Sequence, residues 1–253
     1  MVIGRNQNPW VEVNLRLLGR NAKLGGDEDA PVELVRRRSG GGTVFHDLGN
    51  VNYCVISPTG AFDRDKHAVM VVRALHGSGV DNATVNNRHD IVLNEVIDEP
   101  HNPAIGKGPD DRVEASRLLK VSGSAYKLTR LRSLHHGTCL LSSPNLKTIS
   151  QYLRSPAKPY IKARGVDSVS SPIANVNLRN EAFEEAVVAE FRKSYGNAVP
   201  VVLSEDVTRI PDVAKGLREL KVRSTTKYVN CADKRLVRGM DILADATVHL
   251  FKS

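Results

Sequence analysis

Short β-prone runs alternate along this chain with stretches of helical spacing. The apolar run 51–57 is bounded by Pro58 and Gly60 and predicts a strand, because β-branched and aromatic residues between turn residues are typical of strands. Further strands are expected at 33–35, 82–85, 91–97, 118–125 and 138–141.

Helical spacing marks two longer stretches. Apolar residues in 63–75 recur every three or four positions, and Gly77 is placed to end the helix. In 181–195 they recur every four positions, with Asn180 as the expected N-cap and Gly196 as the stop. Shorter helices are expected at 10–18, with Trp10 packed in the core, and at 146–153. Mixed strands covered by two or three helices predict an α+β fold with α/β-type layers.

Composition narrows the class of protein. A chain of 253 residues suits one sizeable domain, or one domain with a small appendage. No apolar run approaches the roughly 20 residues that span a bilayer, so no membrane partner is expected. The net charge of +8 favours acidic or phosphate-bearing partners. Nucleic acid is not expected, because only 5% of residues are aromatic and no DNA- or RNA-binding motif is present.

The cysteines indicate a reducing compartment. Cys54, Cys139 and Cys231 cannot form a closed set of disulfides, and they lack the C-x-x-C spacing of zinc sites. Cys54 and Cys139 lie in strand-like apolar runs and are expected to be small buried residues. The N-terminus shows neither a signal peptide nor a presequence, which taken alone favours the cytoplasm.

The stretch 36–50 (RRRSGGGTVFHDLGN) carries the clearest candidate chemistry. Three arginines lead into Gly40–Gly42, whose backbone can adopt positive φ and expose successive N–H groups to an anion. The alternative is a glycine turn in a hairpin with a solvated basic flank. The stretch is not a P-loop, and Phe45 stands where a dinucleotide fingerprint needs its third glycine.

Four strings resemble the lipoate–protein ligase family. They are 36–50 itself, then 2–10 (VIGRNQNPW), 120–126 (KVSGSAY) and 135–138 (HHGT), and all stand in the order found in that family. The family belongs to a superfamily with biotin ligases and octanoyltransferases. The residues of the four strings are most similar to those of its fungal members. The resemblance implies a mixed, largely antiparallel sheet covered by helices, like the biotin/lipoate ligase catalytic domain.

The resemblance also sets expectations about domain limits. Residues 1–200 would form the catalytic domain, lacking the first strand and helix that relatives place upstream. Residues 201–253 would be a small C-terminal segment that stops matching the family after about residue 218.

Lipoate ligation is the activity that the resemblance implies. Lipoate and ATP would form lipoyl-AMP, with Mg²⁺ as a cofactor, and a lysine of an acceptor protein would then take the lipoyl group. The implied acceptors are lipoyl domains of 2-oxoacid dehydrogenase E2 subunits and the glycine cleavage H protein, and the enzyme would be a mitochondrial monomer. The alternatives are a lipoyl or octanoyl transferase that uses a preformed activated acyl group, and an inactive truncated remnant.

Lys120 is the catalytic residue that the resemblance implies, placed against the acyl carbonyl and the α-phosphate. The alternative for Lys120 is a surface lysine on an edge strand. The implied nucleotide contacts are Arg37, Gly42, Thr43, Val44, Phe45 and Lys120. The implied lipoate contacts are Lys120, Gly40, Gly41, His46, Ser122, Gly123, Ser124 and Ala125.

Five side chains leave alternatives open. Asp90 resembles a family aspartate near the phosphates and is a candidate Mg²⁺ contact, or else an exposed carboxylate at a strand start. His46 and Asp47 are adjacent on an extended chain and would point to opposite faces, so a structural hydrogen bond is favoured over a shared metal. For His135 and His136, packing and backbone support are favoured over acid–base catalysis.

Overall fold

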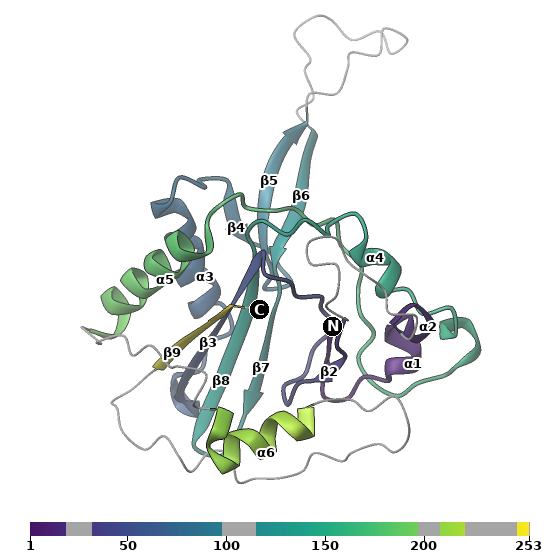
Figure 1. Cartoon of the computed structure of the whole chain (residues 1–253). Helices are drawn as coiled ribbons and strands as arrows, with labels where there is room; N and C mark the ends of the chain where they lie inside the picture. The colour runs from purple at the N-terminus through teal and green to yellow at the C-terminus, as the bar shows by residue number, and fades with distance from the viewer. Residues whose placement is uncertain (19–31, 98–114, 197–207, 221–246, 253) are drawn as a thin grey trace, which may run out of the picture.

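A computed structural model describes residues 1–18, 32–97, 115–196, 208–220 and 247–252 (Figure 1). Its strands are β1 (Val2–Ile3), β2 (Val35–Arg36), β3 (Asn50–Pro58), β4 (Ala83–Val85), β5 (Ile91–Ile97), β6 (Ala115–Ser122), β7 (Ser124–Leu128), β8 (Arg132–Leu140) and β9 (Thr247–Lys252). Its α-helices are α1 (Pro9–Glu12), α2 (Leu15–Leu18), α3 (Lys66–Gly77), α4 (Ile149–Tyr152), α5 (Asn180–Tyr195) and α6 (Pro211–Leu220). Turns of 3-10 helix lie at Thr59–Ala61 and Lys158–Tyr160, among others.

The strands form two antiparallel sheets and one parallel pair. One sheet has the order β7-β8-β3-β9 and the other β4-β5-β6, while β1 and β2 pair in parallel. The backbone N–H of Thr138 donates to the carbonyl of Gly123 (3.2 Å), which joins the two sheets where β6 gives way to β7. The predicted α+β class and the mixed, largely antiparallel sheet are confirmed.

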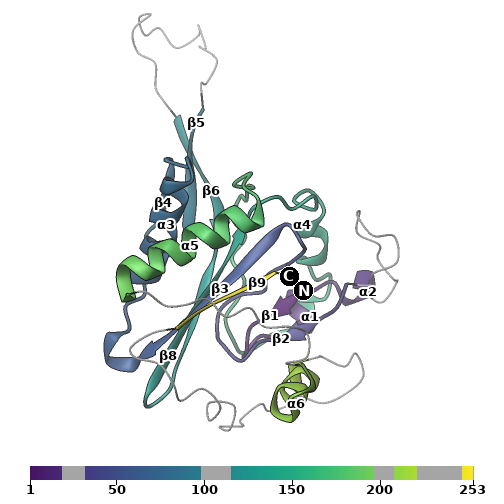
Figure 2. The ribbon, with the colours of Figure 1, turned by 60° about the vertical axis from the view of Figure 1, so that its left-hand side comes forward.

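The main core lies between the sheets and two helices. Buried and less buried residues alternate along β3 and β8, as expected when one face of a strand packs inward. Helices α3 and α5 lie side by side against this face (Figures 1 and 2), and Phe183 and Val187 of α5 are fully buried in the same core as Tyr53 and Val55 of β3. The hydrophobic effect of such burial contributes roughly 1.5–3 kcal/mol for each large side chain.

A second, smaller core holds the N-terminal strands. Ile3 of β1 and Phe45 pack with Tyr152 of α4, and the Phe45 and Tyr152 rings lie 6.5 Å apart. The backbone of Val2 exchanges hydrogen bonds with that of Val44 (2.8 and 2.9 Å). The chain that leaves the glycine-rich stretch is therefore anchored to β1.

The helix predicted at 10–18 is wrong as a continuous element. It is split into α1 and α2, because Val13 is fully buried and has extended backbone angles (φ −126°, ψ 138°). The expectation that Trp10 packs in the core is also wrong, since its side chain is 56% exposed. Burying Val13 takes precedence over helical continuity here.

Other boundaries differ by smaller amounts. Helix α5 begins at Asn180 itself, and the N-cap is Arg179, because the Asn180 side-chain amide donates to the carbonyl of Leu48 (2.9 Å). Gly196 ends the helix with φ +88°, as predicted. The predicted strand 118–125 is divided at Gly123 into β6 and β7, and β8 begins at Arg132, well before 138. The expected loops 21–31 and 98–114 lie outside the described residues.

The last described strand belongs to the main sheet. β9 pairs with β3 in antiparallel register, from Val51 opposite Lys252 to Ile56 opposite Thr247. Among the described helices, none is long and apolar enough to cross a membrane.

Candidate active site

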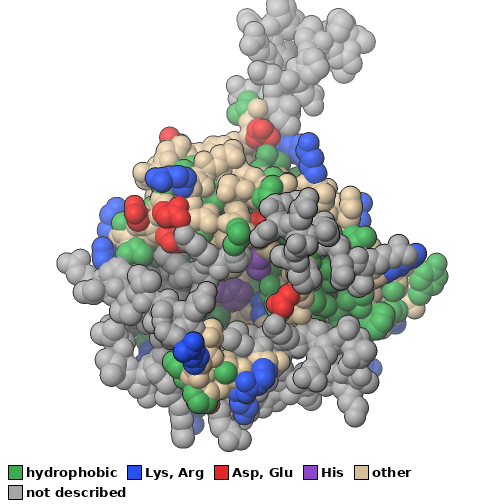
Figure 3. Space-filling model, in the orientation of Figure 1, with side chains coloured by type: hydrophobic (Ala, Val, Ile, Leu, Met, Phe, Trp, Pro, Cys, Tyr) green, Lys and Arg blue, Asp and Glu red, His purple; other side chains and the backbone are tan. Residues whose placement is uncertain are grey.

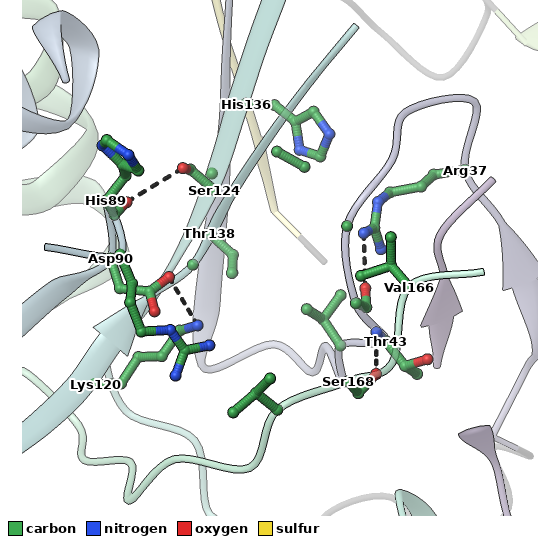
Figure 4. A pocket seen from close by; sticks show the side chains of 18 of the residues that line it. Arg37, Thr43, His89, Asp90, Lys120, Ser124, His136, Thr138, Val166 and Ser168 are labelled. Atoms are coloured by element: carbon green, nitrogen blue, oxygen red, sulfur yellow. Dashed lines mark hydrogen bonds and ion pairs between the residues drawn. The ribbon is translucent and has the colours of Figure 1, made fainter. Parts of the chain in front are cut away.

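A cavity of about 460 Å³ opens between the glycine-rich stretch and the junction of the two sheets. Figure 3 shows histidine side chains recessed at the centre of this face of the molecule. Figure 4 shows two walls facing each other, one with Lys120 and Asp90 and the other with Thr43 and Ser168. A cavity of this size is typical of small-molecule sites.

Lys120 and Asp90 form an ion pair on the first wall. Lys120 Nζ lies 2.8 Å from Asp90 Oδ1, and the two side chains are 25% and 10% exposed. Lys120 lies near the end of β6 opposite Val92, where a β-bulge interrupts the register with β5. A side chain at Gly123 would put its Cβ 3.1 Å from Lys120 Nζ, so glycine leaves room for the ammonium group. Lys120 therefore faces the cavity, and the alternative of a surface lysine is not supported.

A tight turn places Asp90. The side-chain oxygen of Asn86 accepts hydrogen bonds from the backbone N–H groups of Arg88 (2.9 Å) and Asp90 (3.1 Å). Between them His89 has φ +62°, a left-handed conformation that is uncommon outside glycine and enriched at functional sites. His89 Nδ1 contacts Asp65 Oδ1 at 2.6 Å, which holds the turn against the start of α3. Asp90 is buried, so the alternative of an exposed carboxylate is wrong.

The second wall is the glycine turn, residues 40–43. Gly41 has φ +89°, and a side chain there would put its Cβ 2.9 Å from Arg37 Nη2 and 3.2 Å from the Ala125 methyl group. Positive φ was expected somewhere in Gly40–Gly42, and within these three residues it is found at Gly41. The turn therefore depends on glycine at this position.

The guanidinium of Arg37 holds the turn from inside. Its Nε donates to the carbonyl of Gly40 (3.1 Å), and its Nη2 donates to those of Gly40 (2.6 Å) and Gly42 (2.7 Å). Its Nη1 donates to the carbonyl of Val2 (3.4 Å). Burial lowers the pKa of Arg37 to about 10. Arg37 was predicted to contact nucleotide phosphate, but most of its hydrogen-bond donors are directed to main-chain carbonyls, and its structural effect is to shape the turn.

Residues 166–169 close the second wall. The Thr43 backbone N–H donates to Ser168 Oγ (2.8 Å), and Gln7 Nε2 donates to Ser168 Oγ (3.1 Å) and to the carbonyl of Val166 (3.0 Å). Thr43 Oγ1 donates to Gln7 Oε1 (2.8 Å). The N-terminal string 2–10 therefore joins the glycine turn to a segment far away in sequence.

Small residues of β7 and β8 leave the space between the walls open. Ala125, Gly137 and Thr138 line the cavity here. A side chain at Gly137 would put its Cβ 2.3 Å from the hydroxyl of Tyr53, so this position admits only glycine while Tyr53 stays in the core. The Tyr53 hydroxyl in turn contacts Ser122 Oγ (3.4 Å).

Two histidines of the cavity are held neutral. Burial, then nearby positive charge including Arg37, lowers the pKa of His46 and of His136 to about 4. The Asn50 amide donates to His46 Nδ1 (2.9 Å), while His136 Nε2 is hydrogen-bonded to Ser39 Oγ. Asp47 points elsewhere and accepts from Ser143 and Asn145, so the preference for structural hydrogen bonds over a shared metal agrees with the geometry.

The cavity brings together most of the residues singled out from the sequence. It is lined by Arg37, Gly41, Gly42, Thr43, Val44, His46, Asp90, Lys120, Gly123, Ser124 and Ala125. Gly40, Phe45 and Ser122 are not part of its lining. The Phe45 side chain packs in the second core, Ser122 is buried behind the cavity against Tyr53, and the Gly40 carbonyl accepts from Arg37. What each lining residue binds stays a prediction.

Several lining residues were not expected from the sequence. They are Asn52, Arg64, Asn87, Arg88, His89 and 166–169. Arg88 and His89 directly precede Asp90, and that adjacency was an available signal. Arg64 and 166–169 reach the cavity only through tertiary folding, and no local pattern marks them.

Neither cysteine in the described part of the chain lines the cavity. Burial raises the pKa of the Cys54 thiol to about 12 and that of the Cys139 thiol still further. Cys139 is fully buried as expected, while Cys54 is only partly buried, and Cys231 lies outside the described residues. Among the described residues, no group of three or more His, Cys, Asp or Glu side chains is arranged to hold a metal ion.

A family model described as the lipoyl protein ligase A/B catalytic domain matches residues 1–198. The chain belongs to this family. It is 41% identical over 191 residues to a Schizosaccharomyces pombe protein assigned as a lipoate-protein ligase A, covering 76% of this chain and 44% of that one. It is 34% identical over 211 residues to the lipoate-protein ligase A of Psychrobacter cryohalolentis, covering 79% and 52%. The chain thus spans about half the length of these curated relatives.

Solved structures share the lipoyl protein ligase A/B fold. The crystal structure of P. falciparum LipL1 in complex with lipoate matches with a TM-score of 0.61 at 26% identity, covering 90% of this chain and 60% of that chain. A bi-partite lipoate protein ligase from Thermoplasma acidophilum, described with its E2 lipoyl domain, matches at 0.58 and 20% identity, covering 85% and 74%. A lipoate-protein ligase A bound with ATP matches at 0.54 and 21% identity, covering 85% and 76%.

Proposed function

We propose that this chain attaches lipoate to a lysine of lipoyl domains in an ATP-dependent reaction that passes through lipoyl-AMP. Family membership and the names of the curated relatives support lipoate and ligation. One observation carries the proposal: the ammonium group of Lys120 and the backbone of the glycine turn face one cavity from opposite walls (Figure 4). An anionic intermediate between them would meet a fixed cation on one side and the glycine backbone of Gly41 and Gly42, which carries no side chain, on the other.

Both chemical steps build up negative charge. In the first, the lipoate carboxylate attacks the α-phosphorus of ATP and pyrophosphate leaves. In the second, an acceptor lysine amine attacks the acyl carbonyl and AMP leaves. Fixed cations and N–H donors stabilise such transition states. Lys120 would contact the acyl carbonyl and the α-phosphate, so the same cation would serve both steps.

The pair with Asp90 orients Lys120. A lysine ammonium has rotatable donors on a flexible stem, and the ion pair selects one direction of approach into the cavity. Holding the ammonium in place before the ligand arrives removes part of the entropic cost of the reaction. Asp90 would therefore act as a positioning residue for Lys120.

Asp90 offers a single carboxylate to Mg²⁺ on this wall of the cavity. One or two carboxylates normally hold the ion together with substrate phosphates, and Asp90 offers such a carboxylate on the cavity wall. Bound there, the ion would neutralise charge on the phosphates. Asp90 would contact the ion, and Lys120 would remain the cation that faces the acyl group.

The same cavity would accept the lipoyl chain beside Gly41 and Gly123, which carry no side chain, and Ala125, which carries a single methyl group. The proposed acceptors are lipoyl domains of 2-oxoacid dehydrogenase E2 subunits and the glycine cleavage H protein.

The two cysteines in the described part of the chain do not favour an octanoyl transfer through a thioester. The thiols of Cys54 and Cys139 lie outside the cavity, and their raised pKa values keep them protonated at neutral pH. A transferase that accepts preformed lipoyl-AMP would need no cysteine and remains the second candidate.

Incubation with ATP, Mg²⁺, lipoate and a purified lipoyl domain tests the proposal. Intact-mass spectrometry should show one lipoyl adduct on the acceptor, dependent on ATP. An adduct formed only with synthetic lipoyl-AMP would replace the ligase by the transferase. No adduct under either condition would indicate an inactive remnant.

A further inference from the structure

Gln7 is a buried polar residue at the centre of four side-chain hydrogen bonds. Its Oε1 accepts from the Gly4 backbone N–H (2.9 Å) and from Thr43 Oγ1 (2.8 Å). Its Nε2 donates to the carbonyl of Val166 (3.0 Å) and to Ser168 Oγ (3.1 Å). The side-chain amide is thereby saturated, with its acceptor toward the glycine turn and its donors toward 166–168.

At Gly165, directly before 166–168, the backbone lies so close to the N-terminal turn that no side chain would fit between them. Gly165 has φ +146°, and a Cβ there would lie 2.3 Å from the carbonyl oxygen of Asn6. Ser168 Oγ also accepts from the backbone N–H of Thr43 (2.8 Å). Within the described part of the chain, the hydrogen bonds that tie 165–169 to other segments all end on Gln7 or Thr43.

Little hydrophobic packing adds to these contacts. Val166, Asp167 and Val169 are exposed at the cavity, so little hydrophobic burial fixes them. Exposed segments held by few contacts open at low free energy. The position of this cavity wall therefore depends on the two donors of the Gln7 amide and on the Thr43 N–H.

We propose that Gln7 is a positioning residue that fixes 166–168 against the glycine turn and so sets the width of the cavity where the ligand binds. This deepens the function proposed above and rests on it. Gln7 does not line the cavity itself, so its effect on ligand affinity is transmitted through Thr43 and Ser168.

The test variant is Gln7→Met, which keeps the length of the side chain and removes all four hydrogen bonds. We expect KM for both lipoate and ATP to rise about tenfold, which is the effect of losing two ordinary hydrogen bonds to the wall. We expect kcat to stay within about threefold, because Lys120 is untouched. A residue that merely stabilises the fold would instead reduce the active fraction, which lowers kcat and leaves KM unchanged.

Ser168→Ala is the matched variant on the other side of the contact. It removes the hydroxyl on the exposed segment and leaves the N-terminal turn intact. The contact can therefore still be tested if the Gln7 variant fails to fold. We expect the same direction of change in KM, about threefold. In the double variant the two effects should not add, because both act through one contact. A strictly additive double variant would overturn the coupling.

Peptide-resolved hydrogen exchange separates this proposal from the proposed function. In Gln7→Met the amides of 165–170 and of Thr43 should exchange at least about tenfold faster than in the parent protein, while α3 and α5 stay protected. This readout needs no ligand and no turnover, so it stands even if the parent forms no lipoyl-AMP. Unchanged exchange at both sites, or faster exchange with unchanged KM in an active enzyme, would overturn the proposal.

Discussion

The ammonium nitrogen of Lys120 lies 2.8 Å from Oδ1 of Asp90; Lys120 reaches this contact from β6, and Asp90 from the turn that directly precedes β5, next to the β-bulge. Hydrogen bonds to charged groups are the stronger ones in proteins, and a partner left without its counter-charge in a partly dry site loses orientation. The pair therefore links the shape of the β5–β6 hairpin to the chemistry of the cavity.

Replacing Asp90 tests that link. Asp90→Asn should slow lipoyl-adenylate formation about tenfold or more, because a charge-assisted hydrogen bond contributes roughly 1.5–3 kcal/mol. It should also raise the Mg²⁺ concentration needed for half-maximal rate if Asp90 contacts the ion. Asp167→Asn is the control, since Asp167 also lines the cavity but is exposed. Equal effects of the two substitutions in a pyrophosphate-release assay would contradict a special role for Asp90.

The glycine turn allows a comparison between adjacent glycines. Gly41→Ala should weaken binding of lipoate and ATP and lower the melting temperature, because φ at this position is +89° and the new methyl group would lie 2.9 Å from Arg37 Nη2. A non-glycine residue held at such an angle costs roughly 1–3 kcal/mol. Gly40→Ala should change much less, because a Cβ at Gly40 meets no atom within 4 Å. Similar losses at both positions in a calorimetric titration would be inconsistent with this geometry.

We expect both stability and nucleotide binding to depend on the forked shape of the Arg37 guanidinium as well as on its charge. Arg37→Lys keeps the cation but cannot reproduce the forked contacts to the carbonyls of Gly40 and Gly42. We expect it to lower the free energy of unfolding by about 1–3 kcal/mol and to weaken nucleotide binding. Arg38→Lys, at the next position, should change both quantities much less. Full nucleotide binding by Arg37→Lys would show that only its charge is needed.

Two buried histidines predict a dependence of stability on pH. His67 Nδ1 and His135 Nδ1 lie 3.3 Å apart, and burial first, then positive neighbours, lowers the pKa of each to about 4. Between about pH 6.5 and 4 the unfolded chain binds protons there that the folded chain does not. The free energy of unfolding should therefore fall as pH falls through this window, with no contribution from these groups above about pH 7.

Denaturant titrations at several pH values measure this effect. His67→Gln, which cannot titrate, should reduce the loss of stability between pH 7 and 5. Its hydrogen-bond partner Tyr195 lies outside the cavity, so the substitution leaves the proposed site unaltered. A free energy of unfolding that does not change between pH 7 and 5 in the parent protein would refute the expectation.

Local patterns in the sequence were enough to predict the class of fold and the longer elements. The period-2 burial of β3, the face of α3 and the stop at Gly196 follow from local residue types, so they could be predicted. The break at Val13 could not, because it depends on a tertiary site that buries this residue. The pairing of β9 with β3 likewise depends on contacts between distant parts of the chain.

The candidate site also combines residues that local sequence predicts with residues that only tertiary folding brings together. Lys120, Asp90 and most of the glycine turn were found through short strings, and the structure brings them to one cavity. Arg64 and residues 166–169 carry no local signal, since only folding brings them there. The hydrogen bonds of Arg37 to main-chain carbonyls could not be predicted either, because a motif identifies the residue but not the direction of its hydrogen bonds.

The role of Lys120 is measured by the rate of lipoyl-adenylate formation in Lys120→Ala compared with the parent protein. We expect a loss of about a hundredfold or more, because a charge-assisted contact in a dry site contributes about 3 kcal/mol to the transition state. The melting temperature should change little, and purified lipoyl-AMP should be transferred slowly as well. Adenylation by the variant at near the parent rate, with the parent active, would remove Lys120 from the mechanism.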